Sequence, residues 1–222
     1  MLKREFRTTG DGSLTFYLPD WNEHYHSKHG AIQEALHVYI DAGLQYFLNT
    51  TKQNTVAILE IGFGTGLNAF LTQQFSEKEN SFIEFTGVEA YPVPISEITT
   101  FNYPKLLKAP EETFMKLHKT PWEESIQISE KFVLKKRKQF FSEIEDKNVF
   151  HIIYFDAFGA RVQPELWTET IFKKMYEALK KEGLLVTYAA KGSVKRAMQQ
   201  AGFKVEKLPG PPGKREMLRA VK

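Results

Sequence analysis

The sequence contains no cysteine among its 222 residues. Disulfide bonds and thiolate zinc sites are therefore excluded, and a cytoplasmic location is the expectation for such a chain. No segment approaches the roughly 18 consecutive apolar residues of a membrane-spanning helix. The first residues, MLKREFRTTGDG, lack the apolar core of a secretory signal. We accordingly expect no membrane attachment.

An excess of charge of one sign is also lacking, because 30 Lys and Arg nearly balance 27 Asp and Glu. The net charge of +3 is too small to indicate an anionic partner, so the distribution of charge matters more. The six histidines have no carboxylate partners at metal-ligand spacing, and we expect no metal site. The hydrophobic fraction of 42% suffices for one domain over residues 1–222, with 1–53 as an N-terminal cap segment.

The most informative stretch is TVAILEIGFGTGLNAFL, residues 55–71. Its branched apolar run predicts a strand buried on both faces, as in a parallel sheet. Gly62, Gly64 and Gly66 follow at once, and a helix is expected from Leu67. A strand, a glycine turn and a helix together direct backbone N–H groups and a helix N-terminus at a ligand.

Two ligand classes compete for this turn. A dinucleotide fingerprint has the spacing G-x-G-x-x-G, whereas the third glycine here comes one residue earlier and Leu67 takes that position. Glu60 ends the strand, and its carboxylate would repel a pyrophosphate but suit a cationic amino-acid group. The pattern E-x-G-x-G-x-G resembles motif I of class I S-adenosylmethionine (SAM) methyltransferases. A glycine turn without a ligand is the alternative.

Further strands are expected at 83–88, 150–155, 184–188, 203–205 and 217–221. Glu89 follows the second strand at the position that binds ribose hydroxyls in this architecture, and Asp156 follows the 150–155 strand, which should lie next to the first. Helices are expected over 31–46, 67–76, 164–179 and 194–201, with Gly183 ending the third. The prediction is a Rossmann-like α/β fold with a mostly parallel seven-stranded sheet and an antiparallel C-terminal hairpin.

Two surface features allow more than one interpretation. The densest basic cluster either lies on an edge strand with its side chains in solvent or contacts nucleic-acid phosphates; it comprises Lys131, Lys135, Lys136, Arg137 and Lys138. Three aromatic side chains before the first helix either pack in the core or form a lid or base-stacking wall; they are Trp21, Tyr25 and His26.

Four longer motifs together resemble the methyltransferase domain of the bifunctional MnmC family; they are YHSKHGAIQEALHVYI (25–40), GFGTGLN (62–68), YFDAFGARVQPELWTE (154–169) and GPPGKREML (210–218). The resemblance implies SAM as cofactor and methylation of the primary amine of 5-aminomethyl-2-thiouridine at wobble position 34 of tRNA. It is closest to a stand-alone form of that domain. No FAD and no oxidase domain are then expected, and a separate enzyme would install the aminomethyl group.

The resemblance also implies roles for individual residues. Asp156 would face the amine as the catalytic residue; at an ordinary pKa of about 3.9 it would orient the amine rather than act as a strong base. The cofactor would contact Glu60, Gly62, Phe63, Gly64, Gly66, Asn68, Glu89, Ala90, Asp156 and Phe158. Substrate or RNA contacts are expected at Tyr25, Lys191, Lys214 and Arg215, with Lys195 and Arg196 as further candidates. Residues 137–140 lack the carboxylate that often binds adenine.

Two other functions fit the same motifs. One is a different transferase, either a small-molecule N-methyltransferase or an aminopropyltransferase, since both can share the fold and an acid after the fourth strand. The other is a non-catalytic module that binds SAM or RNA. Glu60, the three glycines, Glu89 and Asp156 argue against a module that has lost its chemistry.

Overall fold

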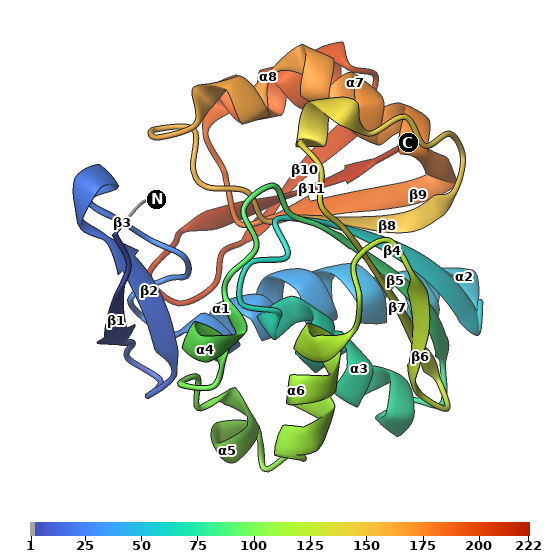
Figure 1. Cartoon of the computed structure of the whole chain (residues 1–222). Helices are drawn as coiled ribbons and strands as arrows, with labels where there is room; N and C mark the ends of the chain where they lie inside the picture. The colour runs from blue at the N-terminus through green and yellow to red at the C-terminus, as the bar shows by residue number, and fades with distance from the viewer. Residues whose placement is uncertain (1–2) are drawn as a thin grey trace.

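The computed structural model describes residues 3–222. Its main sheet has the strand order β10-β11-β9-β8-β4-β5-β7-β6 (Figure 1). Strands β7, β5, β4, β8 and β9 run parallel, while β11 and β10 close one side as an antiparallel hairpin. The bounds are β4 Thr55–Ile61, β5 Phe82–Val88, β6 Ser125–Ser129, β7 Phe132–Arg137, β8 Phe150–Phe155, β9 Leu179–Thr187, β10 Lys204–Pro209 and β11 Glu216–Val221. The expected α/β class and the position of β8 beside β4 are confirmed.

The sheet has eight strands in the described residues rather than the seven expected. The additional strand, β6, pairs antiparallel with β7 and forms the edge of the sheet. Its sequence SIQIS buries Ile128 while most of its other side chains remain accessible, so its apolar pattern is weak. The basic segment in β7 is therefore an interior strand and not an edge strand.

Helices cover both faces of this sheet (Figure 1). Along β4 the side chains alternate: Val56 and Ile58 pack in one core, and Leu59 and Ile61 pack in the other. The first core includes side chains from the helical segment 31–51, α3 (Leu67–Lys78), α5 (Tyr103–Leu107) and α6 (Glu111–Lys119). The second includes those of α7 (Glu169–Ala178) and α8 (Gly192–Gln200). The short helix α4 spans Ile95–Ile98, and 3-10 turns occur at η1 (Pro19–Trp21), η3 (Phe141–Glu143) and η4 (Pro164–Trp167).

The N-terminal segment forms a small separate sheet of β1 (Glu5–Thr8), β2 (Leu14–Leu18) and β3 (Glu23–His24), drawn in dark blue in Figure 1. Phe16 of β2 is fully buried and packs edge-on against Phe101 and Tyr25. This contact anchors the cap to the loop that precedes α5. The cap therefore borders the carboxyl ends of the parallel strands, where ligands bind in this type of sheet.

The first long helix contains a π-helical segment. It begins as α1 (Ala31–Ala35), continues as η2 (Leu36–Gln45) and ends as α2 (Tyr46–Thr51). The wider π turns bury Val38, Tyr39 and Ile40 together, which three successive residues of an ordinary amphipathic helix would not do. Because π segments shift the register of a helix, they are often found where a side chain must reach a functional site.

One expected helix end is wrong. The helix that leads to β9 ends at Ala178 and not near Gly183. Leu179 already pairs with Phe150 of β8, and the register then shifts before Leu184 pairs with Ile152. Glu182 has a left-handed backbone with φ of 64°, as expected where a strand bulges. Among residues 3–222, no helix is long and apolar enough to cross a membrane.

Candidate active site

The glycine turn lies between β4 and α3, at the carboxyl edge of the sheet. All three glycines have positive φ, with 92° at Gly62. A Cβ at Gly62 would lie 2.8 Å from the backbone oxygen of Asp156, so only glycine fits so close to the end of β8. The Gly62 and Phe63 N–H groups both donate to the Val88 carbonyl at 3.0 Å. The turn is thus fixed between the ends of β5 and β8.

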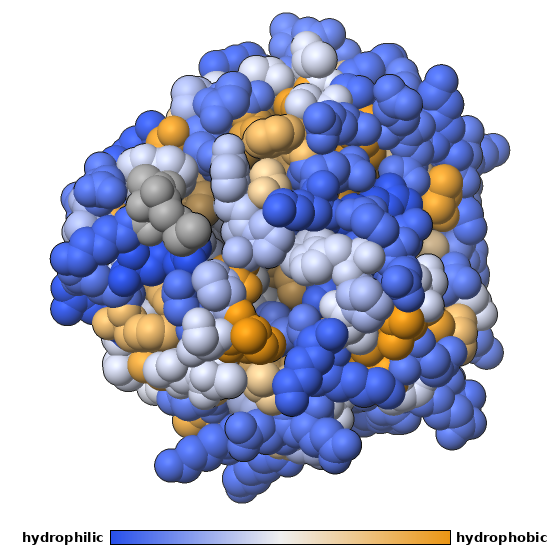
Figure 2. Space-filling model, viewed as in Figure 1, coloured by the Kyte–Doolittle hydropathy of each residue, from blue (hydrophilic) through white to orange (hydrophobic). Residues whose placement is uncertain are grey.

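A cleft of about 1560 Å³ opens above this turn. Figure 2 shows this face of the molecule hollowed near its centre, with hydrophobic side chains beside the hollow. Its walls come from the cap, the glycine turn, the segments after β5, β8 and β9, and the loop between β10 and β11. Sequence-predicted site residues that line it are Tyr25, Gly62, Phe63, Gly64, Asn68, Glu89, Ala90, Asp156, Phe158, Lys191, Lys214 and Arg215.

Asp156 lies in the cleft wall and receives two side-chain hydrogen bonds. The Tyr39 hydroxyl donates to Oδ1 at 2.6 Å, and the Asn68 amide donates to Oδ2 at 2.8 Å. The Asp156 backbone N–H donates to the Ile61 carbonyl at 3.0 Å. The carboxylate is therefore held by donors from two helices that meet beside the glycine turn.

Burial raises the pKa of Asp156 from 3.8 to about 6. The hydrogen bonds from Tyr39 and Asn68 oppose this rise because they stabilise the charged form, and the charge of nearby Glu34 adds to it. Burial and the Asp156 charge raise the pKa of Tyr39 well above 10, so this hydroxyl remains a donor. Asp156 is consequently a stronger base near neutral pH than its residue type implied, which corrects the expectation of an ordinary pKa.

Glu89 lies at the end of β5 and faces the same turn. Its Oε2 accepts from the Gly64 N–H at 3.0 Å, and its Oε1 accepts from the Tyr91 N–H at 2.9 Å. A carboxylate has further lone pairs beyond these two bonds, so it can still accept hydroxyl donors from a ligand. Burial raises its pKa. This placement agrees with the ribose position expected from the sequence.

Glu60 and Gly66 do not line the cleft. Glu60 is 1% exposed, its Oε2 has no partner among the described residues, and burial raises its pKa well above 4.5. Gly66 caps α3 with φ of 70°, and a Cβ there would lie 2.7 Å from His118 Nε2. Both residues support the turn from behind, and direct contact of either with a cofactor stays a prediction.

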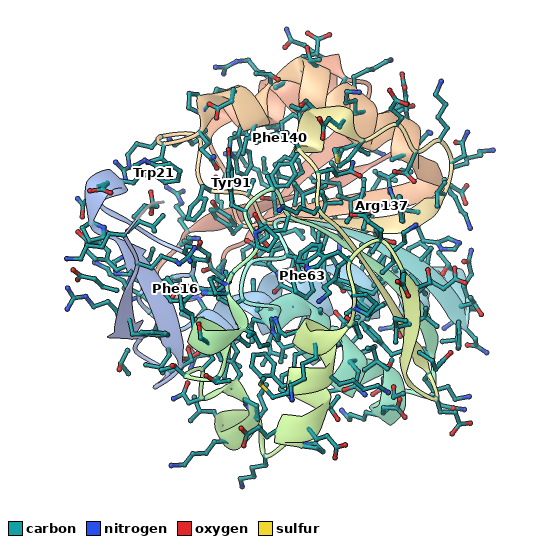
Figure 3. The ribbon with its side chains drawn as sticks, viewed as in Figure 1. Phe16, Trp21, Phe63, Tyr91, Arg137 and Phe140 are labelled. Atoms are coloured by element: carbon teal, nitrogen blue, oxygen red, sulfur yellow. The ribbon has the colours of Figure 1, made fainter. Side chains whose placement is uncertain are left out.

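Aromatic rings form two walls of the cleft. Phe158 meets Trp21 and Tyr25 edge to face, with centroids 5.4 and 4.9 Å apart. Across the opening, Tyr91 and Phe140 are 70% and 52% exposed and their centroids lie 6.1 Å apart. Figure 3 labels Trp21, Tyr91 and Phe140 at this opening. Exposed aromatic faces at the edge of a cleft suit stacking against a planar ring.

His26 lies deeper and belongs to a packing network. Its Nδ1 is 2.9 Å from the Thr15 hydroxyl and its Nε2 is 3.4 Å from the Thr65 hydroxyl. Burial lowers its pKa from 6.5 to about 4, so the ring is neutral at physiological pH. No group of three or more His, Cys, Asp or Glu between residues 3 and 222 is arranged to hold a metal ion.

The basic cluster in β7 does not form one surface. Lys136 is 1% exposed and donates to the His118 carbonyl at 2.8 Å, and burial lowers its pKa from 10.5 to about 8. Arg137 pairs with Asp146 at 2.6 Å. The alternation of the strand turns neighbouring cations to opposite faces. A continuous phosphate-binding strip over residues 131–138 is therefore wrong.

Basic side chains instead gather around the cleft. Lys191 and Arg215 are exposed at its wall, and their contact with RNA stays a prediction. Arg161 also lines it and donates to the carbonyls of Trp21 and Asn22. Lys214 points inward, where it pairs with Glu34 of α1. Arg161 was missed because its position depends on a loop contact with the cap.

Other site residues were also missed from the sequence. Tyr39 lies in the helix expected over residues 31–46, and the π segment that brings its hydroxyl to Asp156 leaves no sequence signal. Glu34 is 7% exposed although it lies on a helix that reads as an ordinary surface helix. Tyr188 follows β9 and donates to the Ala157 carbonyl at 2.8 Å. Each reaches the cleft through tertiary packing.

The polar groups of the cleft suit a ligand with both an ammonium and hydroxyl groups. Asn68 lines the cleft, and its Oδ1 is buried without a partner among residues 3–222. This acceptor lies beside the glycine turn, and Glu89 provides the acceptor for hydroxyls. Near the expected adenine position the cleft is lined by Phe140, Phe141 and Ser142. None of these three side chains carries a carboxylate. An adenine there would meet aromatic surface and backbone.

Several known proteins are similar to this chain in sequence. A "tRNA 5-methylaminomethyl-2-thiouridine biosynthesis bifunctional protein MnmC" of Leptospira borgpetersenii is 29% identical over 87% of this chain. The same-named protein of Leptospira interrogans is 28% identical over 95% of it. These matches cover 31% and 34% of the relatives, so the chain spans about a third of their length.

Solved structures show the same fold. The crystal structure of MnmC2 from Aquifex aeolicus has a TM-score of 0.78 and 25% identity, covering 99% of this chain and 70% of that one. Spermidine synthase from Thermotoga maritima has a TM-score of 0.55 at 14% identity over 99% of this chain and 71% of that one, a similarity of fold alone. The family model described as S-adenosyl-L-methionine-dependent methyltransferase matches residues 103–222. The chain therefore belongs to this methyltransferase family, whose cofactor is S-adenosyl-L-methionine.

Proposed function

We propose that this protein methylates the primary amine of 5-aminomethyl-2-thiouridine at position 34 of tRNA. The observation that carries the proposal is the Asp156 carboxylate in the cleft wall, held by Tyr39 and Asn68 beside the glycine turn. A carboxylate so placed both attracts an alkylammonium and accepts its proton. The MnmC relatives are named for the biosynthesis of 5-methylaminomethyl-2-thiouridine in tRNA, which is the product of this methylation.

The cofactor would lie along the glycine turn. Gly62, Phe63 and Gly64 would approach it through backbone, Asn68 Oδ1 would accept from its amino group, and Glu89 would accept from its ribose hydroxyls. Ala90, Tyr91 and Phe140 would border its adenine. When bound, the cofactor supplies a methyl group that is already activated by a positively charged sulfur.

The chain must then provide an amine with a free lone pair. An alkylammonium has none, so a proton has to leave its nitrogen before the methyl can be accepted. Asp156 is ionised above about pH 6 and would take that proton while Tyr39 and Asn68 keep the carboxylate oriented. General bases contribute roughly 10²–10⁴-fold to rate, and correct positioning of the nucleophile adds to this.

The opening of the cleft fits a single-stranded region of RNA. Trp21, Tyr25 and Phe158 offer a ring wall that is distinct from Tyr91 and Phe140 at the expected adenine position. Unstacked loop bases are recognised by such rings. Lys191 and Arg215 would contact the phosphates around the target nucleotide.

The test is to incubate the purified protein with isotopically labelled SAM and tRNA from cells that cannot methylate this nucleotide. Digestion and mass spectrometry of the nucleosides should show one added methyl on the amine at position 34. An added aminopropyl group would indicate the other transferase class, and methylation of a free small amine but not of tRNA would indicate a small-molecule enzyme. No transfer to any acceptor would contradict the proposal.

A further inference from the structure

Lys214 lies in the loop between β10 and β11, yet its ammonium points into the cleft and pairs with Glu34 Oε1. Its Nζ lies 3.9 Å from the centroid of the Tyr188 ring. Glu34 is 7% exposed, and its Oε2 accepts from the Ser27 N–H at 2.7 Å. In this pair the Glu34 side chain is 9% exposed and the Lys214 side chain is 32% exposed, so the more buried carboxylate depends on the ammonium for charge compensation.

The loop that carries Lys214 is fixed against the cap at two further points. His37 Nε2 lies 2.8 Å from the Pro209 carbonyl oxygen. A Cβ at Gly213 would lie 2.1 Å from the His29 ring, so the loop backbone and that ring are in close contact. These contacts hold the loop against the N-terminal segment, and the Lys214 side chain lies in the cleft wall.

Charged and titratable groups face Asp156 from every element packed around it. The cleft that contains Asp156 is also lined by Glu34 of α1, Tyr39 of η2, Tyr188 after β9 and Lys214 of the hairpin loop, and Glu60 of β4 lies buried behind the glycine turn. Glu34 and Lys214 act on Asp156 in opposite directions, because the anion disfavours its ionised form and the cation favours it. Tyr39 and Tyr188 are held in their neutral forms by burial, which raises the pKa of both well above 10.

We propose that Lys214 is a positioning residue for the reaction under "Proposed function": paired with Glu34, it balances that carboxylate and keeps Asp156 ready to accept the proton of the substrate ammonium. In the step concerned, one N–H bond of the ammonium breaks and one O–H bond forms on Asp156. The nitrogen keeps the electron pair for the incoming methyl. The proposal rests on the proposed function for the identity of the substrate.

The experiment measures the titration of Asp156 directly in the full chain without cofactor or tRNA. Protein labelled with ¹³C at aspartate carboxyls is titrated by NMR, and the Asp156 signal is assigned by its loss in Asp156→Asn. The wild-type midpoint is expected near pH 6. Lys214→Met should raise it by roughly one pH unit and Glu34→Gln should lower it by a similar amount.

The double variant Glu34→Gln/Lys214→Met removes both charges and should return the midpoint close to that of the wild type. A merely structural pair would not give opposite shifts that cancel. Lys207→Met is the matched control, since Lys207 lies on the same hairpin and pairs with Glu216 at 2.8 Å in an exposed ion pair. This control should leave the midpoint unchanged.

The low-pH limb of kcat/KM for tRNA methylation should move with these midpoints. Equal midpoints in all variants, or shifts of one direction in both single variants, would overturn the inference even if tRNA is methylated. If the wild type fails to methylate tRNA while the opposite NMR shifts are present, the proposed function is overturned, together with the role of Lys214 in that reaction. The electrostatic coupling of Lys214 and Glu34 to Asp156 would then still hold.

Discussion

At the scale of single residues, the hydroxyl of Tyr39 is the contact that most directly controls Asp156. It donates to Oδ1 at 2.6 Å and stabilises the ionised carboxylate. Tyr39 and Asp156 are far apart in the sequence, so the folded structure is needed to bring them into contact. Burial and this hydrogen bond act in opposite directions, and burial is the larger effect.

Tyr39→Phe should therefore raise the pKa of Asp156 above its value of about 6, because the stabilising donor is lost while burial remains. The low-pH limb of kcat/KM should move to higher pH, with rates at high pH closer to wild type. The measurement is a pH–rate profile of methyl transfer. Tyr17→Phe is the control, since its hydroxyl donates to Asn22 on the small sheet, outside the cleft. An unchanged limb in Tyr39→Phe would contradict the assignment.

At the scale of elements, the glycine turn and the end of β8 are close enough to touch. Gly62 combines a left-handed backbone with a neighbour at 2.8 Å from a would-be Cβ. Gly12, in a turn of the small sheet, has φ of 83° but nothing within 4 Å of its would-be Cβ. A comparison of alanine substitutions at Gly62 and Gly12 therefore separates the cost of backbone strain from the cost of a steric clash.

Gly62→Ala is expected to lose more stability than Gly12→Ala. Strain alone costs of order 1–3 kcal/mol, and only Gly62→Ala adds the clash with the Asp156 carbonyl. Denaturant unfolding measures the free energy of unfolding of each variant, and calorimetry measures SAM binding. Gly62→Ala should also bind SAM more weakly, whereas Gly12→Ala should bind it normally. Equal losses in both variants would show that the turn does not depend on this close packing.

The elements differ in how far the sequence could predict them. Strands β4 and β8 were predicted almost to the residue because their apolar runs are continuous and bounded by polar residues. The edge strand β6 was not, since one face of it is polar and its partner β7 decides its conformation. The early start of β9 was missed because a bulge at Glu182 extends pairing back to Leu179.

The site was predictable where one local motif carries it. The glycine turn, Glu89 and Asp156 follow buried strands, so their common edge could be inferred. Tyr39 and Glu34 could not be assigned, because a π segment and a contact with a distant hairpin bring them to the cleft. The basic cluster was interpreted wrongly for a related reason, because alternation along β7 buries Lys136 while Lys135 and Arg137 lie on the opposite face.

At the scale of the whole molecule, the cationic side chains at the cleft should determine RNA binding, and those in β7 should not. Lys191→Met should weaken tRNA binding and reduce the slope of log K against log salt by roughly one. Lys136→Met should leave both unchanged, because Lys136 is buried beneath Trp122 and His118. Binding isotherms at several salt concentrations give both quantities. Equal effects of the two variants would contradict this division.

The burial of Lys136 also affects the free energy of unfolding. Lys136 has a folded pKa of about 8, below its ordinary 10.5, because burial disfavours its charge. The folded state is thus penalised by this group at pH below 8, and the penalty fades as the pH rises through 8 toward 10.5. Lys136→Met should remove that penalty, so its unfolding free energy relative to wild type should fall as pH is raised over this window. Denaturant titrations at pH 7 and pH 10 measure it.

If Asp156 accepts the proton of the substrate amine, the rate of single-turnover methylation of tRNA should depend on pH through this one carboxyl group. With wild-type protein, the logarithm of the rate should rise with a slope of one and level off near pH 6. Asp156→Asn should bind SAM normally, lose roughly 10²–10⁴-fold in rate and lack that limb. A wild-type rate that is flat through pH 6, or an Asp156→Asn variant that keeps the wild-type rate, would show that Asp156 does not take this proton.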